Sequence, residues 1–230
     1  MFPVLALLAH GQEAVSLFNG KDLTGWTDAK GRPMAEGWKV EEGGVLHRAG
    51  KGGDLYTAAE YGDFELSWEW KVATGGNSGV KYRLATYAGK TLGPEYQMLD
   101  DVNHPDGKIG PHRQSASLYD LKPADPAVKK LHPAGEWNSS RIVAKGTVLE
   151  HWLNGVKVMS ADTSSEEWKA ILAKSKFKTI ADFARNPAGR IHLQDHGDEA
   201  WFRNISIKVL PATAGSAPAS PAPAVKKEQK

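Results

Sequence analysis

Hydrophobic and polar residues alternate along most of the chain between about residues 15 and 210, which predicts strands rather than helices. The clearest run is Asp63 to Lys71, where every second side chain is large and apolar. Glycines at 75–79 predict a turn, and a strand is expected from Val80 to Ala85 with Lys81 and Arg83 on one face.

The second half of the body shows the same pattern of short strands and tight turns. Asn154-Gly155 lies between two apolar-polar runs, 148–153 and 156–159, and predicts a hairpin with a type I′ turn. Further strands are expected at 191–193 and 205–210. Many short strands with little helix favour an all-β fold, an antiparallel β-sandwich.

One segment departs from this pattern and predicts a short helical insertion at about residues 164–186. Ser164 and Glu167 have the spacing of a capping box at a helix start. Trp168, Ile171 and Leu172 follow at helical spacing.

The two ends differ in composition from the body, which we take as one domain at 15–210. Residues 1–14 contain the apolar run Phe2 to Ala9, which is similar to the hydrophobic part of a signal peptide but lacks the usual basic residues before it. The alternative is an ordinary apolar N-terminal strand. Residues 211–230 are rich in Ala, Pro and Ser, which predicts a disordered tail.

Composition narrows the classes of function. The formal net charge is only +2, which argues against a dedicated nucleic-acid binder. The chain has no cysteine, so disulfides, thiolate nucleophiles and cysteine-ligated metals are excluded. The apolar run near the start is too short to span a bilayer, so no stable membrane insertion is expected. The oligomeric state cannot be predicted from these features.

Several segments in fixed order resemble one family, the 3-keto-disaccharide hydrolases, formerly a domain of unknown function. They are Leu17 to Trp26, Asn77 to Arg83, Pro94 to Asp100, Gly135 to Asn138 together with Trp152 to Gly155, Ile191 to Gly197, and Trp201 to Ile205. The resemblance spans about residues 15 to 210.

This resemblance implies a jelly-roll sandwich similar to concanavalin A and the glucanases. It also implies an enzyme that cleaves 3-keto-glycosides, with a small-molecule carbohydrate as its partner. Members are typically exported, so a periplasmic or secreted bacterial protein is expected, although the N-terminal signal is atypical.

Period-two pairs of polar residues inside these motifs are the candidate substrate-binding residues. Lys81 and Arg83, Glu95 and Gln97, and Gln194 and His196 each share a strand face by parity. From the pattern alone, such residues are more often the solvated outer face of a sandwich. The resemblance favours a sugar site, since these residues lie within its motifs, and on the same ground we add Asp100 and Arg203.

Glu95 and His196 are the candidate catalytic residues. A carboxylate beside cations can act as an acid or base, and a histidine changes charge near neutral pH. We expect Asp195 to be able to orient the imidazole of His196 if a bulge intervenes. The alternatives are that Glu95 only pairs with Arg83 and that His196 is a loop histidine bonded to backbone.

No cofactor is expected. The segment from Asp100 to Asp106 is rich in oxygen ligands, so a calcium-like ion is an alternative there, but such clusters are more often plain turns.

Cleavage of a 3-keto-glycoside needs a base for the C2 proton, donors for the enolate oxygen and an acid for the leaving group. Two other functions stay open at this point. One is a carbohydrate-binding module without chemistry. The other is a conventional glycoside hydrolase, which would pair Glu95 with Asp100 or Asp101.

Overall fold

The computed structural model describes residues 13–34 and 36–213. Most of the predicted signal remnant (1–14) and most of the predicted tail (211–230) therefore lie outside the described residues. The last described residue, Thr213, donates from its amide and its hydroxyl to Asp63 Oδ2, both at 2.8 Å. The described chain thus stays bonded to the body up to residue 213.

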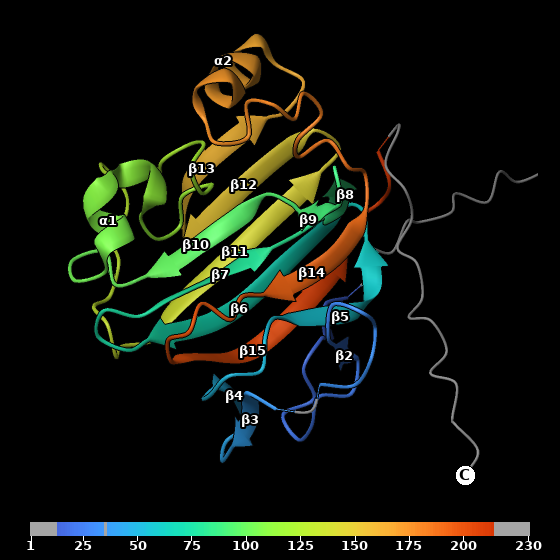
Figure 1. The fold of residues 1–230 in the computed structure, drawn as a ribbon, viewed down its shortest axis with the longest axis vertical. Coiled ribbons are helices and arrows are strands. Elements are labelled where there is room, and N and C mark those ends of the chain that lie inside the picture. The colour runs from blue at the N-terminus through green and yellow to red at the C-terminus, as the bar shows by residue number, and fades with distance from the viewer. Residues whose placement is uncertain (1–12, 35, 214–230) are drawn as a thin grey trace, which may run out of the picture.

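Two antiparallel sheets are stacked face to face with their strands running in similar directions (Figure 1). Sheet A contains, in order, β13 (Val156–Asp162), β12 (Val148–Leu153), β11 (Asn138–Lys145), β6 (Phe64–Val72), β15 (Ala200–Val209), β4 (Val45–Arg48) and β3 (Trp38–Glu41), with β1 (Val15–Ser16) against β15. Sheet B contains β10 (Glu95–Leu99), β7 (Asn77–Lys81), β14 (Gly189–Leu193), β5 (Leu55–Tyr61) and β2 (Trp26–Thr27). The predicted antiparallel sandwich is confirmed.

The remaining elements are short and lie at the rim of the sandwich. They are the hairpin β8 (Ala85–Tyr87) and β9 (Lys90–Leu92), helix α1 (Pro105–Ile109), the 3₁₀ turn Pro111–Arg113 and helix α2 (Glu166–Lys174). Figure 1 shows α1 and α2 outside the two layers. Neither helix is long and apolar enough to cross a membrane, and this holds for all described residues.

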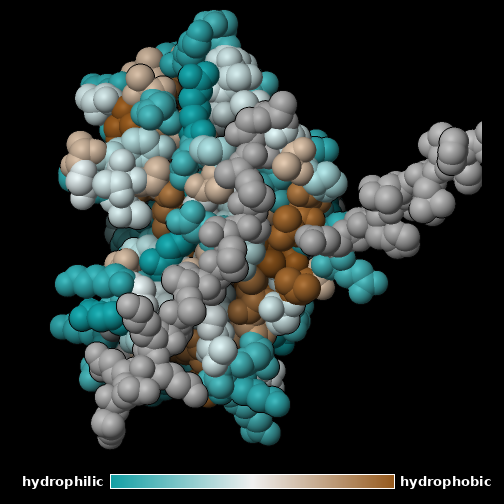
Figure 2. All heavy atoms as spheres, turned by 90° about the vertical axis from the view of Figure 1, so that its right-hand side faces the viewer, coloured by the Kyte–Doolittle hydropathy of each residue, from teal (hydrophilic) through white to brown (hydrophobic). Residues whose placement is uncertain are grey.

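Strand β6 shows how the sequence pattern builds the core. Its residues alternate strictly between buried and partly exposed from Phe64 to Val72, as the period-two pattern predicts. The buried set includes Trp68 and Trp70, which lie between the sheets. Burial of such side chains stabilises the fold by about 1.5–3 kcal/mol each. The side view in Figure 2 shows hydrophilic residues around an apolar band at the surface.

The core also contains polar groups that bond to one another. Trp70 Nε1 donates to Ser140 Oγ at 2.8 Å, and the hydroxyls of Tyr96 and Ser140 lie 2.7 Å apart. His151 is fully buried, with Nδ1 3.0 Å from Ala116 O and Nε2 3.0 Å from the Tyr82 hydroxyl. Burial lowers the pKa of His151 from 6.5 to about 3, so this imidazole is neutral in the folded protein.

The hairpin at Asn154-Gly155 forms as predicted. Both residues have positive φ, 47° and 82°, as a type I′ turn requires.

Two boundary predictions were wrong. Residues Asn77 to Gly79 belong to strand β7 rather than to a turn, and β7 ends at Lys81. Helix α2 begins after Ser165, whose hydroxyl accepts from Trp168 N at 3.0 Å, so the predicted capping box at Ser164 does not form. Ser164 instead donates from its amide and its hydroxyl to Asp162 Oδ1.

Candidate active site

One row of polar side chains crosses sheet B on its outer face. The strand register places Tyr56 opposite His192, His192 opposite Lys81, and Lys81 opposite Glu95. Their neighbours of opposite parity, such as Val80 and Tyr96, are fully buried in the core. Four adjacent strands thus bring a carboxylate, an ammonium, an imidazole and a phenol to one face.

Glu95 and Lys81 form the charged half of this row. Lys81 Nζ lies 3.8 Å from Glu95 Oε2, and the Glu95 side chain is only 8% exposed. Tyr119 N donates to the Glu95 carbonyl at 3.0 Å, so the segment carrying Tyr119 covers the edge of β10. Lys176, which follows α2, places its Nζ 4.0 Å from the centre of the Tyr119 ring. The predicted helical insertion therefore reaches the Glu95 end of the row.

A second row lies beside the first and is centred on Gly79. Gln97 pairs with Gly79 in the register, and Gln194 N donates to Gly79 O at 2.9 Å. A Cβ at Gly79 would lie 2.6 Å from Glu95 Oε1 and 3.4 Å from Gln194 Oε1. Lys81, Glu95, Gln97 and Gln194, all predicted from the sequence, are thus brought together around this glycine.

Several buried polar atoms on this face have no hydrogen-bond partner within the protein. Eight buried side-chain nitrogen or oxygen atoms of the described residues have no hydrogen-bond partner within the protein. Three of the eight are amide oxygens on this face, namely Asn77 Oδ1, Gln97 Oε1 and Gln194 Oε1, and a fourth, His192 Nε2, faces Asp54. Because an unmet buried polar atom costs about 1–3 kcal/mol, such a concentration indicates a surface that binds a polar ligand.

His192 forms a dyad with Asp54 that the sequence analysis missed. Its Nε2 lies 3.0 Å from Asp54 Oδ1, a close but bent contact, and its ring stacks on Tyr56 with 4.6 Å between centroids. Burial lowers the pKa of His192, and the contact with Asp54 offsets part of this effect. Burial raises the pKa of Asp54, but the contacts with His192 and the Asp195 amide outweigh it and lower that pKa overall.

His196 lies at the other end of the face, beyond the last residue of β14. Its Nδ1 is 3.7 Å from Asp198 Oδ2, and its ring packs edge-on against His104, with 5.6 Å between centroids. Asp198 Oδ2 accepts from Asn77 N at 3.1 Å. Since Asn77 and Lys81 are four residues apart on β7, His196 is about 13 Å along the strand from the Glu95 row.

The partner that we expected for His196 has another role. Asp195 accepts from Gly53 N at 2.8 Å and pairs with Arg48 at 2.5 Å, while its own amide donates to Asp54 at 2.9 Å. Asp198, rather than Asp195, is therefore the carboxylate beside the His196 imidazole.

His104, His196 and Asp198 are the described residues best placed to hold a metal ion, since their ligand atoms lie within 4.8 Å of one another. However, His104 Nδ1 accepts from Asp106 N at 3.1 Å. His104 Nε2 lies 3.4 Å from the side-chain nitrogen of Asn77, so both ring nitrogens of His104 already face donor groups of the protein. We therefore place no metal there.

Arg83, a predicted substrate-binding residue, is not on this face. Its φ of 47° breaks the strand parity, and it is 2% exposed. Its guanidinium donates to Asp63 Oδ1 at 2.8 Å and to the carbonyls of Gly62 and Gly146 at 2.9 and 2.7 Å. Arg83 is a structural residue, and the pairing with Glu95 that we considered as an alternative does not form.

The carboxylate of Asp100 likewise bonds only to neighbouring groups of its own turn and of Gly75. Its carboxylate accepts from the amides of Gly75, Val102 and Asn103 and from the Asn103 side chain, at 2.7–3.1 Å. These four donors fill its acceptor sites, so the segment forms a turn and Asp100 has no oxygen left for sugar or calcium.

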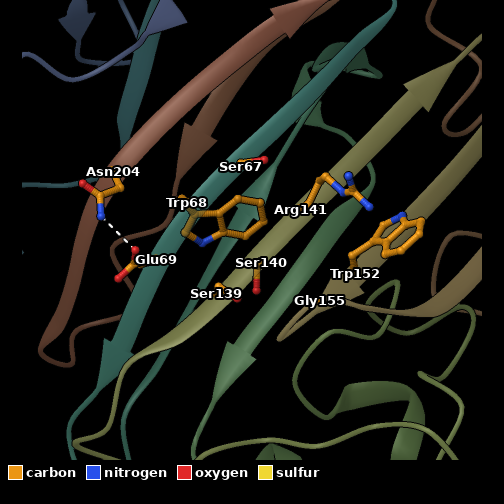
Figure 3. Close-up of a pocket in the computed structure, with 9 residues that line it drawn as sticks. All are labelled: Ser67, Trp68, Glu69, Ser139, Ser140, Arg141, Trp152, Gly155 and Asn204. Atoms are coloured by element: carbon orange, nitrogen blue, oxygen red, sulfur yellow. Dashed lines mark hydrogen bonds between the residues drawn. The ribbon is translucent and has the colours of Figure 1, made fainter. Parts of the chain in front are cut away.

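Arg203 lies on the opposite side of the molecule, on the outer face of sheet A. It donates to Glu69 Oε2 at 2.7 Å and stacks on Trp137 at 4.1 Å. Figure 3 shows this face, with Glu69 bonded to Asn204 and Arg141 beside Trp152. Strand parity is correct for Arg203, but parity does not tell which of two sheets a strand joins.

Comparisons with known proteins agree with this architecture. The model of the 3-keto-alpha-glucoside-1,2-lyase-like domain matches residues 13–208. The 3-keto-disaccharide hydrolase of Bacteroides thetaiotaomicron is 38% identical over 229 residues, which covers 85% of this chain and 78% of that protein.

Solved structures give the same result. A crystal structure described as a glycosyl hydrolase from Parabacteroides distasonis has a TM-score of 0.76 and 33% identity, covering 86% of this chain and 94% of that one. The β-glucanase of Bacillus licheniformis shares only the fold, with a TM-score of 0.50 and 12% identity over 88% of this chain and all of that one. The match of a family model to nearly the whole described body shows that the chain belongs to the 3-keto-alpha-glucoside-1,2-lyase-like family, which includes the 3-keto-disaccharide hydrolases.

Proposed function

We propose that the protein cleaves 3-keto-glycosides, such as 3-keto-trehalose or a 3-keto-glucoside, on the outer face of sheet B. The observation that carries this proposal is the group of unpaired buried polar atoms beside the Glu95–Lys81 pair. The unpaired atoms are amide oxygens, and the hydroxyl groups of a sugar can donate hydrogen bonds to them.

The chemistry uses the ketone at C3, which makes the proton on C2 acidic. A base removes this proton, an enolate forms, and its electrons expel the C1 glycosidic oxygen, which takes up a proton. Water then adds to C1 of the resulting double bond and a proton returns to C2. The sum is hydrolysis, with no paired carboxylates of the usual glycosidase kind.

Glu95 is the proposed base and Lys81 the proposed donor to the enolate oxygen. Their charged groups are 3.8 Å apart on one face, so a ketosugar that lies over the pair can contact both, with C2–H at Glu95 and the C3 oxygen at Lys81. The amides of Gln97 and Gln194 bind hydroxyls in this arrangement. The Glu95 carboxyl, once it has taken the C2 proton, is the proposed acid for the glycosidic oxygen on the neighbouring C1. His196, beside Asp198 at the Asn77 end, is too far along the strand for this step, and we propose that it binds the second sugar.

The geometry supports this function over a two-carboxylate glycosidase. The partners we considered for Glu95 are both engaged elsewhere: Asp100 in its turn, and Asp101 with Lys129 at 2.5 Å and Ser115 N at 2.7 Å.

Incubation of the purified protein with trehalose and with 3-keto-trehalose tests the proposal. Release of sugar from the keto substrate alone is expected. Release from trehalose would replace our proposal with a conventional glycosidase, and release from neither, with binding retained, would replace it with a binding module.

A further inference from the structure

Gly79 lies at the centre of strand β7, where the backbone conformation does not require a glycine. Its φ is not positive, unlike that of most turn glycines in this chain. Glycine within a strand weakens the strand, and it often marks a place where another group must approach the backbone closely. We therefore look for a group that occupies the place where a side chain at position 79 would lie.

The carboxylate of Glu95 fills that space. The nearest heavy atom to a Cβ built at Gly79 would be Glu95 Oε1 at 2.6 Å, closer than real Cβ contacts come. Glu95 pairs with Lys81 in the register and not with Gly79. Its side chain must therefore lean along β7 toward the diagonal position, where only glycine leaves room.

This arrangement divides the two oxygens of the carboxylate between two neighbours. Oε2 faces Lys81 Nζ at 3.8 Å, while Oε1 lies over Gly79, on the side where Gln194 Oε1 is found. A side chain at position 79 would push Oε1 away from this place. Displacing a reacting group by about 1 Å can cost about 10²-fold in rate.

We propose that Gly79 is a positioning residue, which sets the place of the Glu95 carboxylate by having no side chain. This inference rests on the proposed function, since it assumes that Glu95 takes the C2 proton. It adds a residue that touches no reacting atom but decides whether the base can reach its working position.

The test compares Gly79→Ala with Gly50→Ala, whose added Cβ would meet nothing within 4 Å and whose φ is likewise not positive. With 3-keto-trehalose, we expect kcat of Gly79→Ala to fall about 10²-fold while KM stays within about threefold. The melting temperatures of the two variants should agree within a few degrees. A wild-type kcat in Gly79→Ala would overturn the proposal.

A double-variant comparison keeps the proposal testable if Gly79→Ala lowers stability. Glu95→Asp withdraws the carboxylate by one methylene, so it should no longer meet the alanine. Gly79→Ala/Glu95→Asp should then be no slower than Glu95→Asp alone. If the two losses multiply, Gly79 does not act through Glu95.

A readout without substrate separates this inference from the proposed function. The ¹³C resonance of the Glu95 carboxylate should shift in Gly79→Ala and stay in place in Gly50→Ala. An unchanged resonance would overturn the role of Gly79 even if the enzyme cleaves keto sugars. A shifted resonance in a protein that cleaves no keto sugar would confirm the positioning and overturn the function.

Discussion

The two outer faces of the sandwich carry similar charged and amide side chains, but these side chains differ in how fully they are hydrogen bonded. On sheet A, the charged and amide groups are paired: Glu69 accepts from both Arg203 and Asn204, at 2.7 and 2.8 Å, and Arg141 stacks on Trp152 at 3.9 Å (Figure 3). On sheet B, Gln97 and Gln194 each have a buried oxygen without a partner.

This difference is the reason why we place the candidate site on sheet B, although sheet A has a hollow. The outer face of sheet A has a hollow of about 470 Å³, lined by residues such as Ser67, Arg141 and Trp152. Its charged side chains satisfy one another, so a ligand there would gain little from them. On sheet B, the side-chain oxygens of Gln97 and Gln194 have no partner within the protein and stay available to a ligand.

The largest expected effect is the loss of activity in Glu95→Gln. The change keeps the shape and removes the charge, so kcat on 3-keto-trehalose should fall about 10³-fold with no change in melting temperature. Arg203→Ala, on the other face, is the control and should keep wild-type kcat/KM. Turnover by Glu95→Gln near the wild-type rate would remove Glu95 from the mechanism.

Variants of Arg83 and Lys81, which are two residues apart, should affect stability and activity differently. Arg83→Met leaves Asp63 buried without its guanidinium and should lower the free energy of unfolding by about 3–5 kcal/mol. Lys81→Met should keep stability within about 0.5 kcal/mol but lower kcat about 10²-fold, because the enolate loses a donor. Urea unfolding and steady-state kinetics on both variants check this contrast, and the reverse pattern would contradict our assignment of the two residues.

The two histidines of the face should differ in the same assay. We expect His196→Ala to raise KM about tenfold while kcat stays within about threefold, because the variant loses a contact to the second sugar. His192→Ala should cost less, because burial lowers the pKa of His192 and keeps the ring neutral beside Asp54. A greater loss in His192→Ala would transfer the acid–base role to the His192–Asp54 dyad.

A smaller effect concerns stability against pH. His151 has a pKa of about 3 when folded and 6.5 as a reference value, so below pH 6.5 the unfolded state takes up the proton and the folded state does not. Stability therefore falls as the pH drops from 6.5 toward 3. Between pH 7.5 and 5.0, the wild type should lose about 2 kcal/mol more than His151→Gln, as measured by urea unfolding. Equal losses would show that His151 is not the responsible group.

The sequence predicted the sandwich, and it predicted part of the residue cluster that forms the candidate site, for identifiable reasons. Strict alternation along β6 and the Asn154-Gly155 turn are local signals, and both elements formed as expected. Lys81, Glu95 and Gln97 lie close together because paired residues on adjacent strands point to the same face of the sheet.

The failures also have physical causes. Parity fails at Arg83 because a positive φ ends the strand, and His196 lies beyond the end of β14, where parity no longer applies. The dyad of Asp54 and His192 joins residues far apart in the chain, so spacing could not reveal it. The one available signal was that His192 shares the parity of Gln194.

The most direct test of the central claim is a titration of Glu95→Gln with 3-keto-trehalose, followed by NMR of its side-chain N–H groups. The account predicts that the amide signals of Gln97 and Gln194 shift on binding, while the indole signal of Trp152 and the guanidinium signal of Arg203 stay in place. Shifts at Trp152 and Arg203 with none at the two glutamines would place the sugar on sheet A and contradict the account.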